Sequence, residues 1–338
     1  MKIRLRRITA VAAAMVVAAT AAGCGNNSDS TDPDSSGEPQ AASNYPERSI
    51  EMWVGVSAGG GTDSHARILA ESLQSELGKP VVVVNKPGAG GIAMWSSLPT
   101  TKPDGYVISL VSFPQVAGEF VRGNLAFDPT EKLTFIGNAS LNPTALATAA
   151  DAPYDDLAGL VAAAKADPGG IKVGTTGTGS LDYISVESVA RAAGVKFTYV
   201  PFEGTTEGIN AVLSGDIDVM GMGLVSAGEF VKSRDLKLLA IGADERLDTY
   251  PDVGTYVEQG YEILGGKPVA YFTVVAPPGL PADISQKLQD ALKAATESAD
   301  YREKIEAIGG QVAYLDPADT KELVEGQIPE LQKIVDAG

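Results

Sequence analysis

The chain has 338 residues, 44% hydrophobic and 20% charged, which suits a globular protein with room for two domains. Its net charge of -17 and its lack of a basic stripe argue against nucleic acid as a partner. Cys24 and His65 are its single cysteine and histidine, which excludes an intrachain disulfide, a Cys-rich metal site and a zinc site with several histidines. We expect no metal and no cofactor.

The N-terminal segment has the features of an export signal. A basic start precedes residues 8–22, an apolar stretch that is short for a membrane span and ends in small residues before Cys24. This pattern resembles a bacterial lipoprotein signal, and an ordinary signal peptide with an incidental cysteine is the alternative. We predict a signal peptide at 1–23, exported by the Sec or the twin-arginine route, and lipidation at Cys24. Residues 24–44, rich in Ser, Asp and Pro, should form a flexible tether.

The first folded segment predicts a strand, a glycine loop and a helix. An apolar run at 52–56 leads into Ser57–Asp63, which contains three consecutive glycines. Leucines at 69, 73 and 77 then recur at helical spacing. Thr62 or Asp63 is the expected N-cap. Since the first turn of a helix presents unpaired N–H groups, this loop can hold an anion.

Further strands and helices alternate along the chain. A β-branched strand at 81–84 precedes a second glycine loop at 85–91, and a third strand spans 106–111. The strand at 171–173 leads into a third glycine loop, which ends at Ser180 before a helix. Additional strands are expected at 135–141, 195–200, 219–220, 236–241 and 271–276. Additional helices are expected at 92–98, 155–165, 182–193 and 207–213, with three helical stripes between 284 and 335, the last containing Pro329.

This alternation predicts an α/β protein with mainly parallel sheets. In such sheets ligands bind at the carboxyl ends of strands, where all three glycine loops lie. Phe113, just beyond the end of the third strand, is also a candidate ligand-binding residue. Loops in two different lobes suggest a cleft with hinge closure.

An ordered set of motifs resembles the extracytoplasmic receptors of tripartite tricarboxylate transporters, the Bug family. The motifs run in family order over roughly residues 45–310, and the whole set is far more specific than any one glycine motif. They are Tyr45-Pro46, Gly59–Asp63 with Arg67, Gly78–Gly91, Pro103–Tyr106, Gly177–Ser180, Val200–Phe202 with Gly204, Gly215–Asp218, Arg246 with Pro251–Val253, and Glu258–Gly260.

The resemblance implies a two-lobed, periplasmic-binding-protein-like fold of type II with a hinge cleft. Lobe I would comprise 45–143 plus 268–338, and lobe II 144–267. The facing loops would bind a carboxylate through backbone N–H groups. Together with Phe113 and Glu203, the candidate ligand-binding residues are Ser57, Ala58, Gly59, Gly60, Gly61, Thr62, Asp63, Thr175, Gly177, Thr178, Gly179 and Ser180.

The implied function is a receptor, lipid-anchored outside the cytoplasm, that delivers a small carboxylate to the membrane permease subunits of such a transporter. We expect a monomer and no catalysis. The alternatives are a ligand-presenting subunit of a membrane histidine kinase and a surface enzyme.

Three residues depart from the family pattern. Glu203 stands where Lys is usual, Tyr183 where His is frequent, and Gly254 where Pro is usual. Glu203 would repel a dianion, so an amino acid or an aromatic acid competes with a di- or tricarboxylate as the ligand.

Several candidate residues also have a purely structural interpretation. Asp63 is favoured as a helix cap over a ligand contact, and Arg67 as its ion-pair partner. His65 lacks a nucleophile at readable spacing, so a hydrogen bond inside the first helical turn is favoured over catalysis. Met220 and Met222 fit either a pocket wall or a buried strand. Trp53 and Trp95 are expected in the core or the cleft wall.

Overall fold

The computed structural model describes residues 44–177, 180–202, 204–263 and 269–336. Its strands form one hydrogen-bonded network in the order β2-β1-β3-β9-β4-β7-β5-β6, and β8 and β10 also pair with β4. Cys24, Thr178, Gly179 and Glu203 lie outside the described residues, as do the predicted signal peptide and almost all of the predicted tether. Within the described part, no helix has both the length and the apolar character that crossing a bilayer requires.

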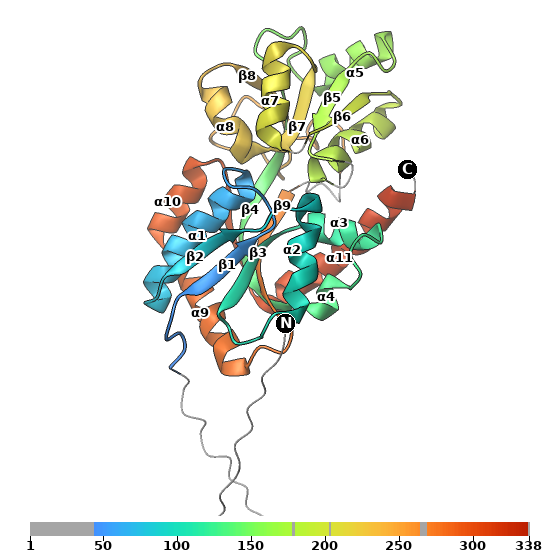
Figure 1. Ribbon diagram of the computed structural model, residues 1–338. Coiled ribbons are helices and arrows are strands. Elements are labelled where there is room, and N and C mark those ends of the chain that lie inside the picture. The colour runs from blue at the N-terminus through green and yellow to red at the C-terminus, as the bar shows by residue number, and fades with distance from the viewer. Residues whose placement is uncertain (1–43, 178–179, 203, 264–268, 337–338) are drawn as a thin grey trace, which may run out of the picture. The chain divides into compact units, whose positions relative to one another are not determined.

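Strand β4 (Thr134–Ala149) connects two groups of strands in the sheet. Its residues Thr134 to Pro143 pair with β9, and Thr144 to Ala149 pair with β7 and β8. The 16-residue strand, which can be followed in Figure 1, therefore belongs to two groups of strands. The sequence predicted a strand only at 135–141, so its continuation through Pro143 to Ala149 was not expected.

The first group of elements contains the two ends of the described chain. Its strands are β1 (Ile50–Val54), β2 (Val81–Asn85), β3 (Val107–Phe113), β9 (Val269–Ala276) and β10 (Gln311–Leu315). Its helices are α1 (Gly61–Leu77), α2 (Ile92–Ser97), α3 (Gln115–Val121), α4 (Pro129–Lys132), α9 (Ala282–Glu297), α10 (Ala299–Ala307) and α11 (Pro317–Asp336), with 3-10 turns η1 (Ala89–Gly91) and η2 (Leu98–Thr100).

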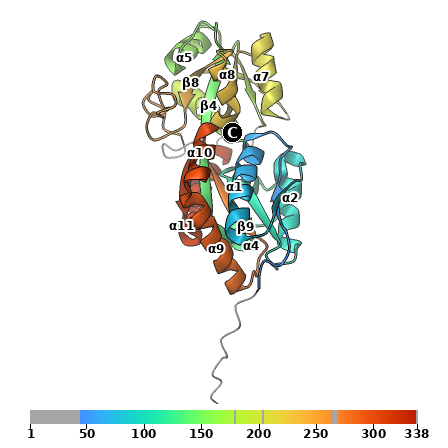
Figure 2. The same ribbon diagram turned by 90° about the vertical axis from the view of Figure 1, so that its left-hand side faces the viewer.

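Alternation along β1 places side chains in two cores. Ile50, Met52 and Val54 pack with residues of α1, α9 and α10. These three helices are labelled in Figure 2. Trp53 packs on the other face with α2, α3 and α11. Trp95 is buried in this second core, so the expectation that the tryptophans are core or wall residues is confirmed.

The second group comprises the middle of the chain. Its strands are β5 (Lys172–Thr175), β6 (Thr198–Pro201), β7 (Val219–Gly223) and β8 (Leu236–Ile241). Its helices are α5 (Leu157–Ala166), α6 (Leu181–Ala193), α7 (Thr205–Ser214) and α8 (Leu224–Lys232). Met220 and Met222 are buried in the core of this group, which decides for the buried-strand interpretation.

The α/β class is confirmed, but the sheet is mixed rather than mainly parallel. Strand β1 pairs in parallel with β2 and β3, and β5 pairs in parallel with β6 and β7. Strand β9 runs antiparallel to β3 and β4, and β4 runs antiparallel to β7, β8 and β10. Hydrophobic patterning identifies a buried strand without giving its direction, so these antiparallel pairs could not be predicted.

Candidate functional site

The loop between β1 and α1 holds the first set of predicted ligand-binding residues. Helix α1 begins at Gly61 with Gly60 as its N-cap, and no side chain caps it. The expectation that Thr62 or Asp63 is the N-cap was therefore wrong. Glycines allow this early start, because Gly59 has a φ of 92°, in the left-handed region that other residues rarely adopt.

The side chain of Asp63 braces this loop from within. It is 2% exposed, and its Oδ2 accepts hydrogen bonds from the Gly59 N–H at 2.9 Å and the Arg67 Nε at 2.8 Å. Its Oδ1 accepts from the Asn85 Nδ2 at 2.8 Å. Arg67 is thus the structural ion-pair partner that the sequence indicated. Direct contact between the Asp63 carboxylate and a ligand stays a prediction, which this internal bonding does not favour.

Charge and hydrogen bonding keep Asp63 ionised. Burial alone would raise the pKa of its carboxyl, but the hydrogen bonds from Arg67, Gly59 and Asn85 and the charge of Arg67 lower it below its ordinary value. A negative charge at this position also favours the N-terminal end of α1.

The start of α1 leaves backbone donors available. The first helical amide with a partner is the Ser64 N–H, which donates to the Gly60 carbonyl at 3.0 Å. Within the described residues, no acceptor is recorded for the N–H groups of Gly61, Thr62 and Asp63. Ser57, Ala58 and Gly59 are exposed, so an anion can reach this turn from solvent.

The described residues of the second predicted loop, 175–177 and Ser180, lie at and after the end of β5 and are also held by an acidic side chain. Asp182 is 8% exposed, and its Oδ2 accepts from the Thr176 N–H at 2.8 Å. Ser180 is the N-cap of α6 and accepts from the Tyr183 N–H at 3.2 Å. Gly177 has a φ of 115°, so glycine is again required by the backbone.

The two bracing carboxylates differ in their electrostatic environment. Burial raises the pKa of the Asp182 carboxyl above its ordinary value, and this effect exceeds the opposing hydrogen bonds from Thr176 and Ser180. No cation is recorded in contact with the Asp182 carboxylate among the described residues. The second loop is therefore held by a carboxyl group whose charge no cation among the described residues neutralises, whereas the first loop is held by an ion pair.

Phe113 and His65 are both core residues. Phe113 is 0% exposed and its ring stacks on Phe135, so its predicted contact with a ligand is not favoured by this packing and stays untested. His65 is 1% exposed, and its Nδ1 lies 2.7 Å from the Ser140 Oγ on β4. The expected hydrogen bond inside the first helical turn was wrong, because the partner comes from a strand 75 residues away. Burial lowers the pKa of His65 to about 3, so the ring is neutral at physiological pH.

Sequence reasoning missed one polar residue beside the first loop. Asn142, on β4, is 6% exposed, and its Oδ1 accepts from the Val225 N–H in the first turn of α8 at 3.3 Å. A Cβ placed on Gly61 would lie 3.1 Å from the Asn142 Nδ2. The available signal was an asparagine inside an apolar run, directly before Pro143.

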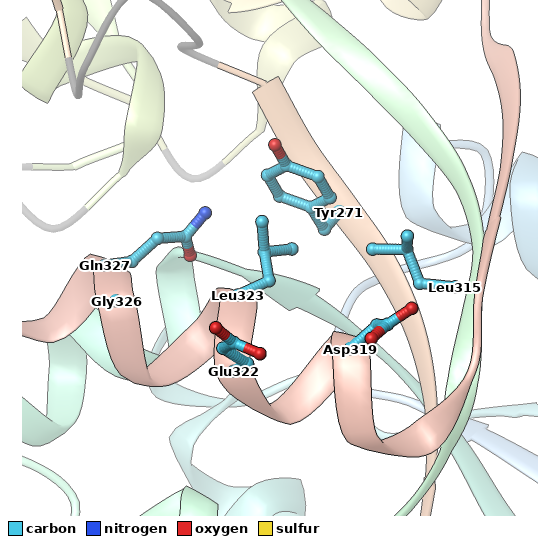
Figure 3. Close-up of a pocket in the computed structure, with 7 residues that line it drawn as sticks. All are labelled: Tyr271, Leu315, Asp319, Glu322, Leu323, Gly326 and Gln327. Atoms are coloured by element: carbon cyan, nitrogen blue, oxygen red, sulfur yellow. The ribbon is translucent and has the colours of Figure 1, made fainter.

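A surface groove of about 490 Å³ lies elsewhere, beside α11 (Figure 3). Its lining comprises Tyr271, Leu315, Asp319, Glu322, Leu323, Gly326 and Gln327. None of these is a predicted site residue. Within the described residues, no group of His, Cys, Asp and Glu side chains is arranged to hold a metal ion.

Comparisons with known proteins agree on one family. The family described as "Tripartite tricarboxylate transporter family receptor" (TctC) matches residues 65–337. A protein of Cupriavidus necator, described as "UPF0065 protein in gbd 5'region", is 34% identical over 265 residues, 78% of this chain and 79% of its own.

Two solved structures share the fold at similar identity. The periplasmic binding protein BugD is 28% identical, with a TM-score of 0.77 over 87% of this chain and 98% of its own. MatC of Rhodopseudomonas palustris, solved with bound malate, is 28% identical, with a TM-score of 0.76 over 86% of this chain and 100% of its own. These likenesses confirm the periplasmic-binding-protein fold.

The prediction that the chain is a receptor and not an enzyme agrees with this family, which consists of solute-binding receptors. The chain belongs to the tripartite tricarboxylate transporter family of receptors, the TctC or Bug family.

Proposed function

We propose that this protein is an extracytoplasmic receptor that binds a small carboxylate and delivers it to the membrane subunits of a tripartite tricarboxylate-type transporter. The observation that carries the proposal is the start of α1, where three backbone N–H groups without a recorded acceptor follow an exposed glycine loop. MatC, which is similar over nearly its full length, was solved with malate.

Backbone donors suit a chain with a net charge of -17. Such a field opposes an anionic ligand at long range, so local dipoles must hold it. The Asp63–Arg67 pair is internally neutral and fixes the loop without adding a net charge. The carboxylate is therefore bound by donors positioned in advance, which lowers the ordering cost of binding.

Two lobes form the receptor, residues 45–143 with 268–338 and residues 144–267, and they close on the ligand. The change of partners of β4 between Pro143 and Thr144 supports this boundary. The loop Thr175–Ser180 supplies the facing donors, with Thr178 and Gly179 included, and Glu203 lies near the ligand. A lipid on Cys24 anchors the protein, and residues 24–44 act as the tether of a monomeric receptor.

Isothermal titration of the exported protein with a panel of carboxylates tests the receptor function. The panel contains malate, adipate, citrate, glutamate and benzoate, with the corresponding amides as neutral controls. We expect at least one acid to bind and to raise the melting temperature, while its amide does neither. Failure of the whole panel, together with no co-purified organic acid in mass spectrometry of the native protein, would refute the proposal.

A palmitate-labelling experiment tests the anchor separately. The wild-type chain should incorporate lipid and remain in the membrane fraction, whereas Cys24→Ala should do neither. Labelling that persists in Cys24→Ala would contradict the assignment.

A further inference from the structure

Asn142 has a defined amide orientation. The Val225 N–H can only donate, so the side-chain atom that it meets at 3.3 Å must be the Oδ1 oxygen. The Nδ2 group, with its two donors, consequently points the other way. Since the side chain is 6% exposed, its direction is set by packing rather than by solvent.

The Nδ2 group points to the meeting place of two helix starts. A Cβ on Gly61, the first residue of α1, would lie 3.1 Å from it, and a Cβ on Gly223, the N-cap of α8, would collide with it. Because both positions are glycine, no side chain fills the space next to the Asn142 Nδ2 group. No acceptor for this Nδ2 is recorded among the described residues.

Helix α8 adds donors of its own. It has nine residues, and within the described structure the N–H groups of Leu224 and Ser226 have no recorded acceptor. The Ser226 Oγ would lie 3.8 Å from a Cβ on Gly61, so it borders the same space. The carboxylate of Asp63, the acidic side chain of this first turn, is turned away into its bonds with Gly59, Arg67 and Asn85. Donors from α1, α8 and Asn142 thus border one space, and Asp63 does not direct its carboxylate into it.

We propose that Asn142 and the first turn of α8 complete the anion site at the start of α1. This subsite takes one carboxylate group of the ligand, with the Asn142 Nδ2 donating to a carboxylate oxygen. Asn142 is then a specificity-determining residue that selects the acid over its neutral amide, because an amide NH₂ facing Nδ2 would place donor against donor. The inference deepens the proposed function and rests on it in identifying the anion as a carboxylate.

Acetate tests the subsite without requiring that the natural ligand be known, because it carries a single carboxylate group. In ¹H–¹⁵N spectra of the exported protein, acetate should shift the Asn142 side-chain amide and the backbone amides of Gly61 and Leu224, while equimolar acetamide should not. If acetate shifts Gly61 but leaves the Asn142 and Leu224 resonances unmoved, the α1 site exists without this subsite and the inference is wrong. If acetate moves none of them, the subsite is equally refuted.

Variants at Asn142 measure its contribution. With any acid that binds the wild type, and otherwise with acetate, Asn142→Ala should weaken binding about 10-fold or more, the size expected for a lost hydrogen bond to a charged group. Asn142→Asp should weaken it further, because a carboxylate replaces the donor. The ratio of acid to amide affinity should fall in both variants, which a purely structural effect would not produce.

Thr148→Val is the matched control on the same strand. It removes a buried hydroxyl that donates to the Asp218 carbonyl at 2.8 Å, and it should lower the melting temperature without changing affinity. An Asn142→Ala variant that keeps wild-type affinity and selectivity would overturn the inference. Should this variant not fold, Asn142→Ser gives the same comparison at smaller structural cost, and unchanged affinity and selectivity there would refute the inference equally.

Discussion

His65 should make the stability of this protein depend on pH in a way that one substitution can isolate. It is the single histidine of the chain, so no other imidazole contributes. Its ring is buried between Ser140 and Phe272, with ring centroids 4.2 Å apart in the contact with Phe272. The folded protein holds the ring neutral, with a pKa of about 3 against an ordinary value of 6.5.

The sign and size of the effect follow from these two pKa values. Below pH 6.5 the unfolded chain binds a proton that the folded chain refuses, so stability is lost as the pH falls from 6.5 towards 3. At pH 5 the loss is about 2 kcal/mol relative to pH 8, taking about 1.4 kcal/mol for each pH unit well below the unfolded pKa.

Urea unfolding of the wild type and of His65→Gln at pH 8 and pH 5 measures this loss. The variant should be less stable at pH 8, because it loses the packed ring, but the difference between the two proteins should shrink by about 2 kcal/mol at pH 5. The ring Hε1 resonance of the wild type should show no titration between these pH values. Parallel pH profiles, or a resonance with a midpoint near 6.5, would refute the reasoning.

Three further predictions concern the two loops. Asp63→Asn should lower the free energy of unfolding by about 1–3 kcal/mol, since it breaks a pair with one buried partner, and an unchanged urea midpoint would contradict this. Asp182→Asn should show a pH dependence opposite to that of His65. Because the pKa of Asp182 is raised in the folded protein, the wild type should gain stability relative to the variant as the pH falls through that pKa. Urea midpoints of the two proteins that are equally separated at pH 7 and pH 4.5 would contradict this. Gly61→Val should weaken carboxylate binding at least about 10-fold in calorimetry, because its side chain would meet the Asn142 Nδ2. The control Gly326→Ala lies in α11 and has no neighbouring atom within 4 Å of the new Cβ, so it should bind normally; equal affinities of the two variants would place the site elsewhere.

Local elements could be predicted from the sequence because their signals are local. Strand β8 has the predicted bounds, and α1 ends at Leu77, followed by Gly78 as a C-cap in the left-handed conformation that glycine favours there. The pairing of Asp63 with Arg67 was also accessible, since residues four apart share a helix face.

Long-range partners could not be predicted. Ser140 is within hydrogen-bonding distance of His65 although 75 residues separate them, and Asn85 donates a hydrogen bond to Asp63 from 22 residues away. Serine and asparagine can bond to many residue types, so the sequence does not identify these partners. Asn142 was missed for the same reason, because its neighbours Gly61 and Val225 lie far from it in sequence. Strand β10 and helices α3, α4 and α8 were missed because they are short or lack a clear period.

The dual membership of β4 has a consequence for the evolution and engineering of this chain. Side chains alternate between faces along a strand, so one residue inserted or deleted near Pro143 would exchange the two faces of every following position. Ala145 and Ala147 would then trade cores with Leu146, while β7 and β8 would keep their own alternation. Length changes should therefore be tolerated in the loops that connect the elements but not within this strand. A cut at residue 143 would also separate β9 from β3 and from Thr134–Pro143 of β4, with which it pairs, so two pieces divided there should not fold separately.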